Sequence, residues 1–148
     1  MGSFSDSPGT IYPALRRLQS KGLVKSGKVA SPGRRRQLVT LTPKGTTELK
    51  KWIRRPVTRQ DVISGLREFM LRFAYSEPVI GASVTIELLN GLKAELGAVV
   101  RGLHDQMNTP KPGMPLSGTL ALESGVRGHE CLLEWCEYAL RVYKRERH

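Results

Sequence analysis

The chain has 148 residues, of which 24 are Lys or Arg and 13 are Asp or Glu, and its formal net charge is +11. This length suits one domain or two small ones and excludes a large multidomain enzyme. No run approaches the roughly 18 to 20 apolar residues of a membrane-spanning helix, and the first residues lack the charged-then-apolar pattern of a secretion signal.

The positive charge is confined to the first part of the sequence. Residues 1–60 contain 14 Lys and Arg against 2 acidic residues, whereas residues 61–148 contain 10 against 11. A basic module joined to a nearly neutral one predicts a division of labour. One part meets a polyanion, and the other part does something else.

The residues that most often carry chemistry form no site. Cys131 and Cys136 are too few for a disulfide scaffold and do not have the spacing of a CxxC metal site, so we expect free thiols in a reducing cytoplasm. The three histidines are scattered, which predicts no metal site and no cofactor. No signature of Ser/His/Asp or Cys/His catalysis is present, and the helical carboxylates suit surface ion pairs. We therefore predict that the protein is not an enzyme.

A helix is predicted over residues 7–21. Ser7 is a good N-cap residue, Pro8 is tolerated at the first helical position, and Gly22 suits a left-handed C-cap. Pro13 conflicts with a regular helix, so we expect a distorted first turn or a late start. Apolar residues recur on one face and cations lie off it: Ile11, Leu15 and Leu18 against Arg16, Arg17 and Lys21.

A basic β-hairpin is predicted next. One strand begins at Leu23, a turn-rich tip covers 27–33, and a second strand returns over 34–41. Thr42-Pro43 repeats the pattern of a capping residue followed by proline, and it starts a helix that runs to about Ile53. We place the domain boundary after this helix, which gives domains 1–56 and 61–148.

The second domain is predicted to be α-helical. An apolar stripe runs from Val62 to about Tyr75, and Glu77-Pro78 starts a long helix. Two heptad-patterned helices, joined by the proline-rich loop 108–117, form an antiparallel hairpin. Because apolar side chains also lie outside the two seams, a second copy of the chain is the simplest cover. The residues assigned to dimerisation are Leu89, Leu92, Leu96, Val99, Leu103, Leu133 and Leu140.

Several short motifs follow one another in the basic region. They are Ser7-Pro8-Gly9-Thr10-Ile11-Tyr12-Pro13-Ala14-Leu15-Arg16-Arg17-Leu18, Lys21-Gly22-Leu23-Val24, Gly33-Arg34-Arg35-Arg36 and Leu41-Thr42-Pro43-Lys44-Gly45. Their order and spacing resemble the recognition helix, wing and following helix of the PadR family of bacterial transcriptional regulators. Residues 66–73 also resemble the start of the C-terminal region in the branch with a long helical tail.

The resemblance implies a mainly α fold with a small β-hairpin wing: a winged helix-turn-helix followed by an α-helical dimerisation domain. It implies a homodimeric regulator of transcription that binds double-stranded DNA through recognition helix 7–21 and basic wing 25–41, and that in some members responds to a small hydrophobic effector. A helix fits the major groove, and Lys and Arg contact phosphates. The residues assigned to DNA are Thr10, Tyr12, Arg16, Arg17, Lys21, Lys28, Arg34, Arg35, Arg36 and Lys44.

The sequence also departs from the family pattern. Family members have two further helices before the Ser-Pro-Gly-Thr motif, whereas six residues precede Ser7 here. We therefore expect a partial winged helix whose apolar stripe is partly uncovered. Two alternatives remain: a truncated relative that pairs with intact regulators without binding DNA, and a protein that binds RNA or another polyanion by charge alone.

The aromatic residues suit either an effector pocket or core packing, and we favour packing. They are Trp52, Phe69, Phe73, Trp135 and Tyr143.

Overall fold

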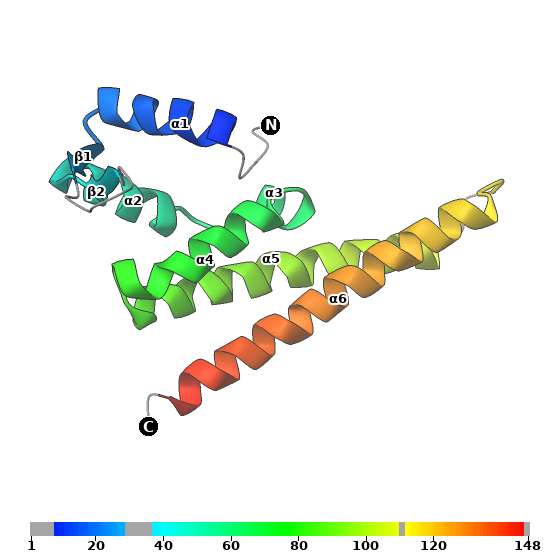
Figure 1. Cartoon of the computed structure of the whole chain (residues 1–148). Helices are drawn as coiled ribbons and strands as arrows, with labels where there is room; N and C mark the ends of the chain where they lie inside the picture. Colours follow the sequence, from blue (N-terminus) through cyan, green and yellow to red (C-terminus); the bar gives the residue numbers. More distant parts are fainter. Residues whose placement is uncertain (1–7, 29–36, 110–111, 147–148) are drawn as a thin grey trace. The chain divides into compact units, whose positions relative to one another are not determined.

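The computed structural model describes residues 8–28, 37–109 and 112–146. The described chain is mainly helical, with one two-stranded sheet (Figure 1). Its elements are α1 (Pro8–Ser20), β1 (Val24–Lys28), β2 (Gln37–Leu41), α2 (Pro43–Arg54), α3 (Arg59–Ile63), α4 (Leu66–Ile80), α5 (Ala82–Asn108) and α6 (Leu116–Arg145). This confirms the predicted mainly α fold with a small hairpin. The chain divides into two compact units, a first unit of Met1–Trp52 and a second unit of Ile53–His148.

The first helix ends as its sequence predicts. Gly22 has a φ of 67°, a left-handed conformation that glycine adopts without strain. The Gly22 N–H donates to the Gln19 carbonyl at 2.8 Å and the Leu23 N–H to the Leu18 carbonyl at 2.9 Å, which is the Schellman pattern. At the other end the helix begins at Pro8 rather than late, because Pro13 lies near the start and its missing N–H removes one helical bond.

The hairpin and α2 meet α1 at a tight corner. Strands β1 and β2 are antiparallel, with Val24 opposite Leu41 and Lys28 opposite Gln37. Thr42 caps α2, since its Oγ1 accepts the Gly45 N–H at 3.0 Å. The same hydroxyl donates to the Gly22 carbonyl at 2.7 Å, which ties the start of α2 to the end of α1.

The helices of the second unit break at different points from those predicted. The stripe expected from Val62 to Tyr75 is divided, because α3 ends at Ile63 and α4 begins at Leu66. The start predicted at Glu77-Pro78 is wrong, since α4 continues through Pro78 to Ile80. The break comes at Gly81, whose φ of 84° turns the chain between α4 and α5.

The core of the second unit lies between α4, α5 and α6, and α5 and α6 run side by side in opposite directions (Figure 1). Four residues assigned to dimerisation, Leu89, Leu92, Leu96 and Val99, are buried in the core of a single chain. The other three, Leu103, Leu133 and Leu140, are half-buried against it. A heptad seam has the same pattern whether its partner helix belongs to the same chain or to a second one.

The aromatic side chains of the second unit pack together. Phe69 is fully buried and stacks on Phe73 with ring centroids 6.5 Å apart. Phe73 meets Trp135 edge to face at 5.6 Å. The Tyr143 hydroxyl donates to Glu77 Oε2 at 2.7 Å, and burial together with this carboxylate raises the pKa of Tyr143 to about 12. These contacts are consistent with the packing role that we favoured.

Both cysteines are free thiols, as predicted. Cys131 is exposed on α6, whereas Cys136 is buried and its S–H donates to the Leu89 carbonyl at 3.2 Å. Burial raises the pKa of Cys136 to about 11. None of the helices within the described ranges is long and apolar enough to span a membrane.

Candidate nucleic-acid interface

One half of α1 carries the residues assigned to DNA contact. At helical spacing, these side chains share the half of the helix that lies opposite Ile11, Leu15 and Leu18. The five residues are exposed, and they are Thr10, Tyr12, Arg16, Arg17 and Lys21. The arrangement gives α1 a cationic side with the exposed Tyr12 ring at one edge and Lys21 just beyond its last residue, which suits contact with a groove and its phosphates.

A shallow groove lies between α1 and the hairpin. Tyr12 and Arg16 line one side of it, and Ser26 and Val39 from the two strands line the other. Gln19 donates to the Ser26 hydroxyl across the groove. The sequence did not single out Gln19 or Ser26, because a polar pair seven residues apart has no spacing that marks a contact.

Two assigned lysines meet at the corner between α1 and α2. The Lys44 ammonium donates to the backbone carbonyl of Lys21 at 2.9 Å. A cation in this place complements the negative end of the α1 dipole. Lys44 thus has a structural contact within the first unit, while the side chain of Lys21 is exposed.

The first unit has a large excess of cations. It contains 11 Lys and Arg against 2 acidic residues, whereas the second unit contains 13 against 11. Glu48 is the single carboxylate among its described residues, and Lys51 already pairs with it at 2.8 Å. The hydrogen bond and charge of Lys51 lower the pKa of Glu48. The remaining cations therefore have no carboxylate within the described part of their own unit to neutralise them.

Part of the predicted wing lies outside the described residues. Arg34, Arg35 and Arg36 belong to this segment, and the side chain of Lys28, the last residue of β1, is also not described. Their contacts with DNA stay predictions.

The apolar face of α1 is partly exposed. Ile11 is 43% exposed and Leu18 is 38% exposed, and Leu15 is half-buried. Among residues 9–27 and 38–52, no apolar side chain is fully buried. The first unit therefore holds little hydrophobic core of its own in these ranges.

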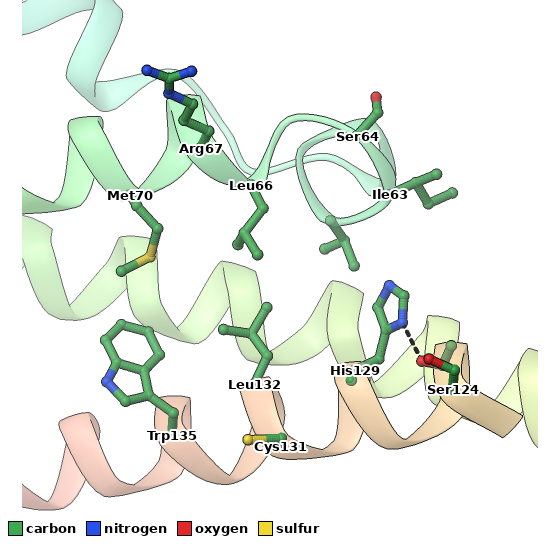
Figure 2. A pocket seen from close by; sticks show the side chains of 13 residues that line it. Ile63, Ser64, Leu66, Arg67, Met70, Ser124, His129, Cys131, Leu132 and Trp135 are labelled. Carbon is green, nitrogen blue, oxygen red and sulfur yellow. Dashed lines mark hydrogen bonds between the residues drawn. The ribbon is translucent and has the colours of Figure 1, made fainter. Parts of the chain in front are cut away.

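The second unit contains an apolar groove of about 800 Å³ between α3–α4 and α6. Figure 2 shows Leu66 and Met70 on one side of it and Leu132 and Trp135 on the other. His129 lies at one end, where Nδ1 is 2.6 Å from the Gly125 carbonyl. The groove is large enough for a small hydrophobic molecule, and the effector stays a prediction.

The described residues combine the elements of a winged-helix module. A helix with a cationic face, a two-stranded hairpin and a capped second helix form the later part of a winged helix, and a helical unit follows. Residues 1–51 match the family model described as "Transcriptional regulator PadR-like family". Residues 1–51 are thus similar to a family of transcriptional regulators.

Two solved structures are similar to the chain at low sequence identity. The structure of Bacillus subtilis PadR in complex with operator DNA is 21% identical, with a TM-score of 0.44, over 94% of this chain and 80% of that chain. The PadR-like transcriptional regulator BC1756 from Bacillus cereus is 20% identical, with a TM-score of 0.48, over 97% of this chain and 81% of that chain. Among curated proteins, none matched the chain.

Proposed function

We propose that the protein binds double-stranded DNA as a homodimeric transcriptional regulator. The observation that carries this proposal is the cationic face of α1, where Arg16 and Arg17 are exposed on a unit with a single described carboxylate. Phosphate contacts from such cations dominate affinity for DNA. The family match of residues 1–51 supports the same function.

The elements have distinct roles in this proposal. Helix α1 enters the major groove, where Thr10, Tyr12 and Arg16 reach base edges and the neighbouring backbone. The hairpin acts as the wing, with Arg34, Arg35 and Arg36 on phosphates. Contacts with phosphates set the position of the protein on DNA and carry little information about base sequence.

The homodimer is supported by exposed apolar side chains on the outer side of α6. Leu116 is 74% exposed, Leu120 is 54% exposed and Tyr138 is 58% exposed. Leu120 and Tyr138 are eighteen residues apart, about five helical turns, so they lie on one line along the helix. This outer side is opposite the one that packs on α5, and its exposed apolar side chains, which Arg127 and Glu134 interrupt, are open to contact with a second copy.

The core residues of the hairpin support the dimer indirectly. Leu89, Leu92 and Leu96 are fully buried within one chain, so a second copy reaches them only if the hairpin opens. With the three half-buried seam residues, they pack α5 against α6. We therefore place the contact between copies on the outer face of α6, defined by Leu116, Leu120, Cys131 and Tyr138.

Binding to a palindromic promoter fragment and to a random duplex of equal length, each titrated with salt, tests this function. We expect tighter binding to the promoter fragment at every salt concentration, because two identical subunits read two half-sites. Equal affinities at all salt concentrations would instead indicate a general polyanion binder. Absence of binding to either duplex, with self-association retained, would indicate the non-DNA-binding interaction protein.

A further inference from the structure

An arginine side chain is buried beneath the end of α2. Arg72, on α4, is fully buried. Its Nη2 donates to the Ile53 carbonyl at 3.2 Å and to the Arg55 carbonyl. Helix α2 ends at Arg54, so the Ile53 carbonyl is one that the helix leaves without a partner, and the Arg55 carbonyl lies just beyond the helix. A cation in this place also complements the negative end of the helix dipole.

One buried carboxylate holds the cations of this region. Asp61, on α3, is 3% exposed, and its Oδ1 lies 2.6 Å from Arg55 Nη2 and 3.6 Å from Arg72 Nη1. Its Oδ2 accepts the Thr58 N–H and hydroxyl, each at 2.8 Å. Burial acts to raise the pKa of Asp61, but the Thr58 hydrogen bonds and the charges of Arg55 and Arg72 outweigh it and lower the pKa. Asp61 is therefore ionised at neutral pH.

Burying the Arg72 guanidinium costs free energy, so its contacts indicate what the charge is there to do. Its Nε and Nη1 are buried without a hydrogen-bond partner among the described residues. An apolar side chain of similar volume would fill the space beside Phe69 without this penalty. What such a side chain cannot do is bind the carbonyls of Ile53 and Arg55. The buried charge of Arg72 thus attaches the end of α2 to α4.

Helix α2 is shared by the two units. Its residues up to Trp52 belong to the first unit, whereas Ile53 and Arg54 belong to the second. Ile53 is fully buried in the second unit, whereas no apolar side chain among residues 9–27 and 38–52 of the first unit is fully buried. A small unit with so little core depends on an external source of stability. The end of α2 is where the second unit can stabilise the first, because the helix continues from one unit into the other.

We propose that Arg72, held by Asp61, is a polar clamp that couples the folding of the first unit to that of the helical unit. The clamp fixes the last turn of α2, and α2 in turn carries the corner at Thr42 that organises α1 and the hairpin. Arg72 is a positioning residue in this device. The proposal stands independently of whether the first unit binds DNA.

The two tryptophans provide one reporter for each unit. Trp52 lies on α2 in the first unit and Trp135 on α6 in the second. Trp52→Phe and Trp135→Phe variants therefore give single-tryptophan chains whose thermal unfolding is followed by fluorescence. In the otherwise wild-type chain, the clamp predicts that the two reporters unfold in coincident transitions.

Arg72→Met, introduced into both single-tryptophan chains, should separate the transitions. We expect the midpoint reported by Trp52 to fall by about 5 °C or more below that reported by Trp135, because the second unit keeps its apolar core. Arg72→Lys retains the charge but places one ammonium where the guanidinium reached two carbonyls, and it should give a smaller separation. Arg141→Met, at an exposed arginine of α6, is the matched control and should leave the transitions coincident.

Asp61→Asn keeps the shape of the anchor but removes its charge, and it should separate the transitions in the same direction. Three results would overturn the proposal. The first is separate transitions in the wild-type background. The second is an equal shift of both reporters in Arg72→Met, including joint loss of both cooperative transitions, which would mean that Arg72 only supports the helical unit. The third is no shift in either reporter.

Discussion

Replacing Gly45 with alanine is expected to disrupt the first unit and with it any binding to duplex DNA. A Cβ at this position would lie 1.9 Å from the Leu23 carbonyl oxygen and 2.8 Å from its carbon. Both atoms belong to the backbone, so no side chain can rotate away. The helix would have to move off the corner where the Thr42 N–H donates to the Leu23 carbonyl at 3.0 Å.

The size of this effect follows from the little core that surrounds the corner. Overpacking costs about 1 to 3 kcal/mol in a well-packed interior, and more where backbone must move. The described residues of the first unit contain no fully buried apolar side chain to offset that cost. We expect the Trp52 reporter to show an unfolded first unit and duplex binding to fall to background.

Gly102→Ala is the matched control for this substitution. Gly102 lies in α5, and a Cβ there would meet no atom within 4 Å. Alanine should stabilise that helix by about 1 kcal/mol, since glycine is a poor helix former. If Gly45→Ala kept the stability and binding of the wild type, α2 would not approach Leu23 as closely as the structure shows.

Replacing Leu96 with alanine should lower the stability of the chain by about 2 to 5 kcal/mol, as for other buried leucines. Leu96 is fully buried in the core between α5 and α6. Because its neighbours belong to the same chain, the decrease should be the same at every protein concentration. Chemical denaturation at several concentrations measures it.

Substitutions on the outer face of α6 should change self-association and leave the stability of the folded monomer intact. A Leu120→Glu, Tyr138→Glu double variant places charge on exposed positions, so its folded monomer should persist. Light scattering should show a dimer for the wild type and a monomer for the double variant. A wild-type monomer at micromolar concentration would contradict the homodimer, and a dimeric double variant would exclude this face as its contact.

Much of the first unit could be predicted because its signals are local. Ser7-Pro8 and Thr42-Pro43 mark helix starts, and Gly22 is the left-handed C-cap that its position after α1 predicts. The β-hairpin was predicted from two short strand-like runs around a turn-rich segment. Such features depend on neighbours within a few residues, which a sequence displays directly.

The second unit shows where local signals fail. Pro78 looked like a helix start, but near the end of α4 it removes one bond, and Gly81 makes the turn instead. The heptad seam predicted a partner helix without specifying which chain supplies it. Arg72 resembled any surface cation, because its burial depends on the Ile53 and Arg55 carbonyls, which lie 19 and 17 residues away.

The residues that organise the candidate interface were only partly found. Arg16 and Arg17 can be assigned from the sequence because cations off an apolar stripe are visible there, and the structure shows both exposed. Gly45 was part of a family motif, but its reason for being glycine is a contact with Leu23, which only the folded corner reveals. Lys44 was assigned to DNA as part of the same family motif, and the structure adds a contact with the Lys21 carbonyl.

The salt dependence of duplex binding tests the central claim, that cations of the first unit contact DNA phosphates, most directly. The slope of log K against log salt falls in magnitude by about 0.9 for each phosphate that the protein no longer neutralises. We predict a shallower slope for the double variant Arg16→Ala, Arg17→Ala and for the triple alanine variant of Arg34, Arg35 and Arg36. The control variant Arg101→Ala, on α5, should have the slope of the wild type. Slopes that match the wild type in both first-unit variants would contradict the account.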